Sequence, residues 1–336
     1  MSTAAIEATA PTRIDLAGGT VDIWPLYLFH PGAVTVNVAI DRRAWCRVET
    51  GQAGLRIESK DTLAKVEGPD VHHVLGDGVL SLVAYILRAL GIESGVKVVT
   101  QSRVPAGSGL GGSSALAVTI AAAAAKAALG RDLDADGLWP VVRDAEAQCI
   151  AVPTGVQDYH AAIHGGVLGI HLDPGTVRVE RLLTDPARVE ECLILVDAGA
   201  TRFSGINNWE VFKGQIDGDD TVRSCLAGIV AAAAKVRTAL LAQRYQEVAA
   251  FMAEEWAARK RLAPGVTTPE IDRIAEAAAA EGGAAKVCGA GGGGMVAVWA
   301  APGRRGAVEA AITSAGFKPQ SFRLDLRGLE VEEGEG

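Results

Sequence analysis

Apolar and polar residues alternate in the first half of the chain at the spacing of half-buried strands. Residues 32–49 contain the β-branched runs AVTVNVAI and AWCRVE, and residues 96–104 (VKVVTQSRV) continue the pattern. Residues 165–172 and 177–183 repeat it on either side of Pro174-Gly175. Because β-branched alternation favours strands and a Pro-Gly pair favours a turn, these segments predict a sheet that ends in a hairpin.

A helical period replaces this alternation in other segments. Residues 113–129 form an alanine-rich run, and residues 134–151 show a helical pattern with a break expected near Pro140. In the second half, residues 227–262 and 269–280 combine helical periodicity with strong helix formers. The second half is therefore predicted to be mostly helical.

The order of these elements predicts an α+β fold of two domains, each with mixed strands and helices. The polar connection at residues 184–187 places the boundary between domains 1–185 and 186–336. The remaining predicted elements are strands at 192–199 and 295–300, a helix at 308–316, an edge strand at 321–326 and a frayed acidic tail at 331–336.

Composition narrows the class of partner. The chain has 336 residues, 49% of them hydrophobic, and a formal net charge of −8. An acidic balance favours neither nucleic acid nor an anionic membrane as partner, so small molecules are expected instead. The five cysteines show no CxxC spacing, and no signal peptide is visible, so we expect a reducing, cytoplasmic setting.

One uncharged stretch resembles a membrane span in length. Residues 104–125 carry no charge, but their first half holds Pro105 and several glycines, which are typical of a loop. The helix predicted at 113–129, which Gly130 would end, is then an ordinary buried helix. We therefore expect no membrane-spanning segment here.

The loop at residues 105–115 (PAGSGLGGSSA) carries the strongest chemical signal in the chain. Glycines permit positive φ and leave backbone N–H groups free to converge on an anion at the start of the next helix. The pattern therefore predicts a phosphate-binding loop. Its candidate ATP-binding residues are Pro105, Gly107, Ser108, Gly109, Leu110, Gly111, Gly112, Ser113 and Ser114.

The glycines are also compatible with a dinucleotide-binding fold or with a purely structural loop. GxGxxG occurs twice by letter, at 107–112 and 289–294, but the second copy leads into a predicted strand, which argues against a dinucleotide-binding fold. The Walker A pattern, GxxxxGK followed by Ser or Thr, does not occur in the sequence. Against a purely structural loop, Ser113 and Ser114 supply helix caps and hydroxyls able to reach Mg²⁺.

Three motifs in order resemble the GHMP kinase superfamily, named for galactokinase, homoserine kinase, mevalonate kinase and phosphomevalonate kinase. Residues 10–22 (APTRIDLAGGTVD) are similar to its first motif, 105–115 to its second and 286–294 (KVCGAGGGG) to its third. The chain is most similar to the branch of D-glycero-D-manno-heptose 7-phosphate kinases and related bacterial sugar kinases. It departs from that branch at Tyr159, where Gln is usual, and in residues 204–209.

The resemblance implies catalytic roles for Asp158 and Arg13. Asp158 would accept the proton of the acceptor hydroxyl, and Arg13 would stabilise the transferring phosphoryl group. The residues alone leave simpler roles open. Asp158 is also suited to capping a helix, and Arg13 to an ion pair with Asp15 or Asp41.

The resemblance also implies where the acceptor and the metal bind. Asp22 would accept hydrogen bonds from sugar hydroxyls, although aspartate is also common in turns. The other implied substrate-binding residues are Gly18, Gly19, Gln157, Gly291 and Gly292, and Arg202 is a candidate for a phosphate already on the sugar. Ser114 and Glu146 would be the Mg²⁺ ligands, with nearby Asp144 as the alternative carboxylate.

The fold and activity implied are those of a two-domain GHMP kinase whose active site lies in the cleft between the domains. It would use ATP and Mg²⁺ to phosphorylate a small-molecule sugar or sugar phosphate, with the anomeric hydroxyl of D-glycero-D-manno-heptose 7-phosphate as first candidate. Galactose or another free sugar is the alternative acceptor. A nucleotide-binding regulatory protein without catalysis is the alternative of another class, and the sequence leaves the oligomeric state open.

Overall fold

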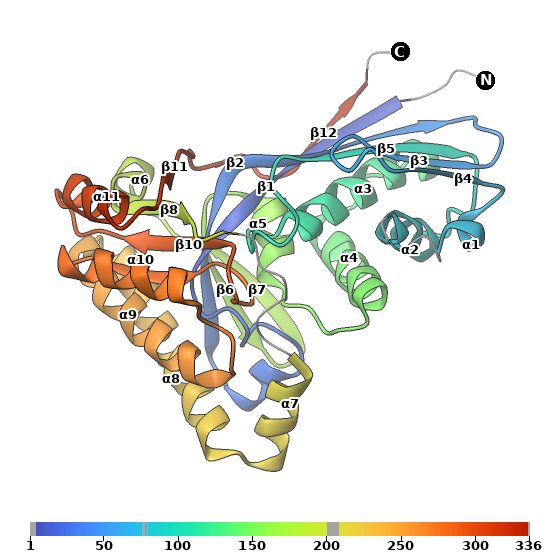
Figure 1. Cartoon of the computed structure of the whole chain (residues 1–336). Helices are drawn as coiled ribbons and strands as arrows, with labels where there is room; N and C mark the ends of the chain where they lie inside the picture. Colours follow the sequence, from blue (N-terminus) through green and yellow to red (C-terminus); the bar gives the residue numbers. More distant parts are fainter. Residues whose placement is uncertain (1–4, 76–77, 79, 200–207, 335–336) are drawn as a thin grey trace.

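A computed structural model describes residues 5–75, 78, 80–199 and 208–334. It confirms the α+β class. Two sheets, one of eight strands and one of four, are joined by helices that cover them (Figure 1). The predicted domain boundary near residue 185 stays a prediction. The chain enters the second sheet after this point, but its C-terminal strand returns to the first sheet.

The larger sheet has the strand order β12-β1-β2-β5-β3-β4, with β6 beside β2 and β7 beside β6. Its strands are β1 (Ala5–Ala17), β2 (Ala33–Thr50), β3 (Leu55–Ser59), β4 (Lys65–Gly68), β5 (Val96–Ser102), β6 (Val167–Asp173), β7 (Thr176–Arg181) and β12 (Glu330–Glu333). The predicted hairpin is confirmed, since Asp173 pairs with Thr176 across Pro174-Gly175. β2 is long enough to pair with β6 along its first part and with β5 along its last.

Helices pack on one face of this sheet (Figure 1). They are α1 (Val71–Val74), α2 (Ser81–Ala89), α3 (Gly112–Leu129), α4 (Ala135–Ile150) and α5 (Gln157–His164). α3 contacts β1 and β2, where its alanines allow a close approach, and α4 packs on α2 and α3. The break expected at Pro140 is wrong, because α4 is continuous; its buried Leu138, Val142 and Ala145 hold it against its neighbours.

The smaller sheet has the order β11-β8-β10-β9 and is antiparallel throughout. It comprises β8 (Leu193–Asp197), β9 (Ala284–Val287), β10 (Met295–Trp299) and β11 (Pro319–Gln320), with helices α6 (Pro186–Cys192), α7 (Asn208–Asp217), α8 (Asp220–Leu241), α9 (Tyr245–Leu262), α10 (Pro269–Ala280) and α11 (Arg305–Ser314). A short 3-10 helix, η1 (Leu26–Phe29), precedes β2. α9 contacts β9 while α8 contacts β2, so this helix pair joins the two sheets.

The C-terminal segment differs from the prediction. The edge strand is β11, just before residues 321–326, and the latter form only an isolated bridge between Leu324 and Ile40. The tail is not frayed over Glu330–Glu333, because β12 pairs with β1, with Val331 opposite Ala8. An acidic composition did suggest a solvated tail, but the open edge of β1 offers backbone partners that the composition does not reveal.

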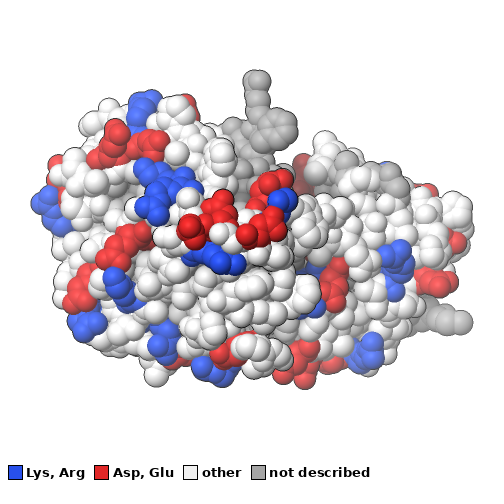
Figure 2. Space-filling view, turned by 90° about the horizontal axis from the view of Figure 1, so that it is seen from below, with Lys and Arg blue, Asp and Glu red and all other residues white. Residues whose placement is uncertain are grey.

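Two helices, α3 and α8, are long and apolar enough to cross a membrane by length and composition alone. Both lie among the core helices of the fold, and the one predicted from the sequence, α3, is largely buried against the first sheet. On the face seen in Figure 2, acidic and basic side chains are interspersed rather than gathered in a single basic patch. The five cysteines are all free thiols.

Candidate active site

The glycine loop between β5 and α3 has the backbone of an anion site. Gly107, Gly109 and Gly111 have φ of 76°, 76° and 72°, a conformation that side chains disfavour. Gly109 and Gly111 are also crowded, because a Cβ would lie 3.0 Å from the backbone N of Gly289 at the first and 2.9 Å from Asp158 at the second. The loop thus needs glycine both for its turn and for close packing against the rest of the site.

The start of α3 differs from the expectation in one respect. Gly111, in the left-handed region, takes the N-cap position, and no side chain caps the helix. Ser113 and Ser114 lie inside the first turn and do not act as N-caps. The first N–H groups of α3 therefore have no side-chain cap, and the first turn itself contains no acidic residue, which suits a phosphate.

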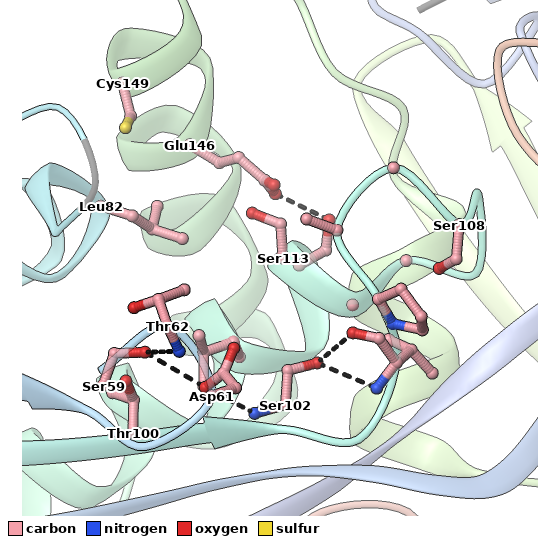
Figure 3. A pocket seen from close by; sticks show the side chains of 18 of the residues that line it. Ser59, Asp61, Thr62, Leu82, Thr100, Ser102, Ser108, Ser113, Glu146 and Cys149 are labelled. Atoms are coloured by element: carbon pink, nitrogen blue, oxygen red, sulfur yellow. Dashed lines mark hydrogen bonds between the residues drawn. The ribbon is translucent and has the colours of Figure 1, made fainter. Parts of the chain in front are cut away.

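A pocket of about 470 Å³ lies beside this loop. Figure 3 shows Ser113 and Ser108 from the loop region on one side, with Glu146 and Cys149 of α4 and Leu82 of α2 across from them. Its far wall is formed by β3, β5 and the turn after β3, through Ser59, Asp61, Thr62, Thr100 and Ser102. The pocket is in the range typical of ligand sites, about 300–1,000 Å³.

Glu146 points from α4 toward the start of α3. Its Oε2 accepts hydrogen bonds from Ser114 Oγ and Tyr159 Oη, each at 2.7 Å, and its side chain is buried. Burial raises the pKa of Glu146 above its usual value, although the hydroxyls of Ser113, Tyr159 and Ser114 act against the rise. Asp144, the alternative carboxylate, is exposed and pairs with Arg143.

Glu146 and Ser114 fit the chemistry of Mg²⁺. This ion prefers oxygen ligands and usually combines one or two carboxylates with nucleotide phosphates and water. The described residues include no group of three or more His, Cys, Asp and Glu side chains that could hold a metal. One carboxylate and one hydroxyl beside the phosphate loop instead match an ion that arrives with a nucleotide.

Arg13 of β1 connects the catalytic candidates. Its Nε donates to Asp158 Oδ1 at 2.7 Å and its NH2 group lies 2.6 Å from the same oxygen. Its NH1 group donates to the carbonyls of Gly109 and Cys288. Asp158 is therefore oriented by Arg13 and does not cap α5, and the ion pair of Arg13 is neither with Asp15 nor with Asp41.

A second, smaller cavity of about 120 Å³ lies on the other side of Asp158. Asp22 lines it, and its Oδ2 accepts a hydrogen bond from the backbone N of Gln157 at 3.0 Å. Burial raises the pKa of Asp22 to about 6, and the negative charges of Asp158 and Asp15 add to the rise. Asp22 is therefore a buried carboxylate that takes up a proton at a higher pH than an ordinary aspartate does.

Four buried charges support the floor of this cavity. Lys286 Nζ lies 2.8 Å from Asp15 Oδ2 and 3.0 Å from Glu255 Oε1. Arg259 NH2 lies 2.9 Å from Glu255 Oε1 and 3.5 Å from Asp15 Oδ2. No member is more than 2% exposed. Although burial alone raises the pKa of Asp15, the charges of Lys286 and Arg259 lower it below its usual value.

The glycines assigned to substrate binding divide into two groups. Gly19 lines the small cavity, and its carbonyl accepts a hydrogen bond from Arg259 NH2 at 2.6 Å. Gly18 lies against the backbone of β2, and Gly291 and Gly292 lie against Val266; none of these three lines the cavity. Arg202 lies outside the described residues.

Several residues of the site were not found from the sequence. Of the third motif, residues 286–294, Cys288, Gly289 and Ala290 line the cavity rather than the later glycines. The motif leads into β10, a strand, as predicted. Other wall residues that were missed are Thr20, Ile23, Gly155, Asn208 and Arg259. Arg259 lies in the run Trp256–Leu262 together with a lysine and a second arginine, and the sequence does not show which of the three side chains turns inward.

The contacts of Tyr159 and of the histidines of α5 are those of residues that support the structure around the site. Tyr159 is buried and donates to Glu146, so the residue that departs from the related branch holds the candidate metal ligand. His160 and His164 stack with ring centroids 5.8 Å apart. Burial lowers the pKa of His160 to about 3. These histidines pack as neutral side chains and, among described residues, have no third metal ligand.

Similarity to known proteins extends over most of the chain. Residues 78–166 match the model of the GHMP kinases N terminal domain, and residues 236–318 match that of the GHMP kinases C terminal domain. The D-glycero-alpha-D-manno-heptose 7-phosphate kinase of Campylobacter jejuni subsp. jejuni serotype O:2 is 26% identical over 340 residues, covering 97% of this chain and 98% of that protein.

Solved structures show the same fold. A D-glycero-D-manno-heptose 1-phosphate kinase from Bacteriodes thetaiotaomicron is similar with a TM-score of 0.79 at 22% identity, covering 98% of this chain and 100% of the other. Lactococcus lactis galactokinase, complexed with galactose, has a TM-score of 0.76 at 17% identity, covering 98% and 95% of the two chains. At these identities the structures establish the fold.

The buried charge cluster generates a first prediction. Lys286→Met keeps the length of the side chain but leaves Asp15 and Glu255 with Arg259 alone, so a buried negative charge is left unpaired. We expect the free energy of unfolding, measured by urea denaturation, to fall by about 3–5 kcal/mol. The matched control is Lys260→Met, since Lys260 pairs with Asp272 at 3.4 Å and both side chains are 39% exposed. That variant should lose no more than about 1 kcal/mol, and equal losses would contradict a special role for the cluster.

The raised pKa of Asp22 generates a second prediction. Between the ordinary pKa of 3.8 and the folded value of about 6, the folded state holds more protons than the unfolded state. Wild-type stability should therefore fall as pH rises through this window, while Asp22→Asn removes the titrating group. We expect the stability of Asp22→Asn relative to wild type to increase by roughly 2 kcal/mol from pH 4.5 to pH 7.

Thermal or urea unfolding across this pH range measures the difference. Asp132→Asn, at an exposed aspartate, is the matched substitution and shows whether the pH dependence belongs to Asp22. Parallel pH curves for wild type and Asp22→Asn would mean that Asp22 is ionised at the same pH in the folded and unfolded chain.

Proposed function

The chain belongs to the GHMP kinases, which are phosphotransferases with a hydroxyl group as acceptor, and we propose that it transfers the γ-phosphoryl group of ATP to a sugar hydroxyl held in the cavity around Asp22. One observation carries this proposal. Asp158 lines both the larger pocket beside the glycine loop and the smaller cavity that holds Asp22. A carboxylate at the junction of two pockets is placed to act between a phosphate donor and an acceptor.

The larger pocket would hold the nucleotide. Backbone N–H groups of the glycine loop and of the first turn of α3 would bind the phosphates, because that end of the helix carries partial positive charge and no side-chain cap. Ser113 and Ser114 would add hydroxyls from the same turn. The base would then lie toward Leu82 and the turn at residues 59–62.

Glu146 and Ser114 would hold Mg²⁺ beside the phosphates. When bound, the ion would neutralise negative charge on the β- and γ-phosphates. Tyr159 would keep Glu146 in place through its hydroxyl, which donates to the Oε2 atom at 2.7 Å. The protein thus supplies few ligands of its own, as expected for a site completed by nucleotide and water.

Asp158 would accept the proton of the attacking hydroxyl. Arg13 holds the Oδ1 atom of this carboxylate, so the side chain is oriented before the acceptor binds. Its Oδ2 atom lies close to Gly111, next to the phosphate loop. Arg13 would also place a permanent positive charge near the transferring group, where it stabilises developing negative charge.

The acceptor is proposed as a sugar or sugar phosphate. The first candidate is D-glycero-D-manno-heptose 7-phosphate, because the relative from Campylobacter jejuni is named as a kinase of this sugar phosphate. We propose its anomeric hydroxyl as the group that accepts the phosphoryl group. Galactose or another free sugar is the alternative, because a galactokinase shares the fold. Asp22 and Gln157 would bind the sugar hydroxyls, and the cytoplasmic location remains a prediction from the sequence.

A panel of acceptors tests the reaction class. The purified protein, with ATP and Mg²⁺, is offered heptose 7-phosphate, galactose, fucose, arabinose and mevalonate in an assay coupled to ADP release. We expect turnover with at least one sugar and none with mevalonate. Failure with every acceptor, together with stabilisation by ATP in a thermal shift assay, would instead support a nucleotide-binding protein without catalysis.

Asp158→Asn separates chemistry from nucleotide binding. Because the carboxylate acts on the acceptor hydroxyl, kcat should fall by about 10²–10⁴-fold while the ATP-induced shift in melting temperature stays near that of wild type. Asp136→Asn, an exposed aspartate in the first turn of α4, serves as the control and should keep both properties. Equal loss of turnover and ATP binding would assign Asp158 a structural role.

A further inference from the structure

A third hollow, of about 520 Å³, opens beside the small cavity. Trp24 and Trp209 stand in its wall and are 57% and 54% exposed. The rest of the wall comes from the last turns of α4 and the segment that follows, through Arg143, Asp144, Ala147, Gln148, Ala151, Val152, Pro153 and Thr154. Two half-exposed indoles in one concave surface are unusual, because tryptophan is normally well buried.

The hollow and the small cavity are lined by neighbouring residues of the same segments. Ile23 lines the cavity and its neighbour Trp24 the hollow; Gly155 lines the cavity and Thr154 the hollow. A backbone bridge joins Ile23 to Gly155. Asn208, which lines the cavity just before Trp209, donates from Nδ2 to the carbonyl of Pro153 at 3.0 Å. The segments that line the cavity around Asp22 therefore continue directly into the segments that carry the indoles.

Size argues that the acceptor extends beyond the small cavity. At about 120 Å³ that cavity is below the usual range of ligand sites, about 300–1,000 Å³, whereas the hollow lies within it. The reacting end of an acceptor fits beside Asp22 and Asp158. The remainder needs space, and the adjoining hollow supplies it.

Charge indicates which end of the acceptor the hollow suits. In the small cavity, Arg13 is bonded to Asp158 and Arg259 to Glu255 and Asp15. A second phosphate placed there would have to share these arginines with the carboxylates that already bind them and would lie near the carboxylate of Asp22. The small cavity is thus suited to hydroxyl groups and not to a dianion.

Arg143 is the cation in the described wall of the hollow. Its partner is Asp144, which is 59% exposed and adjacent in the chain, at 2.7 Å. An ion pair with so exposed a carboxylate is weak, so the guanidinium can turn to a stronger acceptor. The guanidinium also lies over the ring of Trp139, 5.0 Å from the centroid.

We propose that this hollow is the subsite for a terminal phosphate on the acceptor, with Arg143 binding the phosphate and Trp24 and Trp209 packing on the carbon chain that leads to it. The proposal rests on the proposed function and deepens it, since it selects sugar phosphates over free sugars. Guanidinium groups bind phosphate oxygens in pairs, and indole faces pack well on C–H groups.

Two substitutions, one at a positively charged residue and one at its negatively charged partner, provide the test. Arg143→Gln removes the cation and should raise KM for heptose 7-phosphate about tenfold or more, with KM for unphosphorylated heptose unchanged. Asp144→Asn removes the competing carboxylate and should lower KM for heptose 7-phosphate severalfold. Arg131→Gln, at an exposed arginine between α3 and α4, is the matched control and should leave both values at those of wild type.

The indoles are tested separately. Trp24→Ala and Trp209→Ala should each raise KM for the phosphorylated sugar, while KM for ATP stays constant because the nucleotide pocket does not include them. If Arg143→Gln and Asp144→Asn shift KM in the same direction, or alter both sugars equally, the hollow does not bind the phosphate and the proposal is wrong.

Calorimetry distinguishes this failure from failure of the kinase reaction. The full chain is titrated with mannose 6-phosphate, mannose, heptose 7-phosphate and heptose in the absence of ATP. Tighter binding of the phosphorylated sugar in each pair, lost in Arg143→Gln, would support the subsite even without turnover. Turnover of a sugar with no preference for the phosphorylated form would leave the kinase function standing and overturn the subsite.

Discussion

The buried ion cluster of Asp15, Glu255, Arg259 and Lys286 is the constraint on which the site depends. Its members come from three different parts of the fold, because Asp15 is on β1, Lys286 on β9 and the other two on α9. Their charges sum to zero, and removing any one leaves an unpaired charge away from water. The cluster thus fixes the strand of the first sheet against the sheet and helix of the second.

One face of β1 links this cluster to the residues proposed for phosphoryl transfer. Arg13 and Asp15 are two residues apart on β1, so their side chains leave the strand on the same side. Asp15 is held by the cluster, and Arg13 reaches Asp158, the glycine loop and the carbonyl of Cys288. The position of Asp158, the carboxylate proposed as catalytic, is therefore set by the packing of the two sheets, and the loop cannot shift without disturbing it.

Residue patterns over a few positions predicted the loops and helices whose conformation is set by neighbouring residues in the chain. The glycine loop and the helix after it follow from residue types over a few positions, whereas Asp158 was assigned through the family resemblance; the structure brings them together. The ion pairs that join Lys286, Glu255 and Arg259 to Asp15 could not be predicted, because the sequence does not show that distant elements place these residues beside it. The acidic tail and Pro140 misled for the same reason, since an open sheet edge and a buried helix face outweigh local preference.

The separation of these partners along the chain also constrains how the molecule folds. Lys286 and Asp15 are 271 positions apart, and Arg13 and Cys288 are 275 apart. Closing loops of this length has a large entropic cost that only long-range contacts can offset. The full set of contacts around Arg13 and Asp15 therefore requires both ends of the chain: a chain cut before β9 would keep the glycine loop, Arg13 and Asp158 but would lose Lys286 and the carbonyl of Cys288.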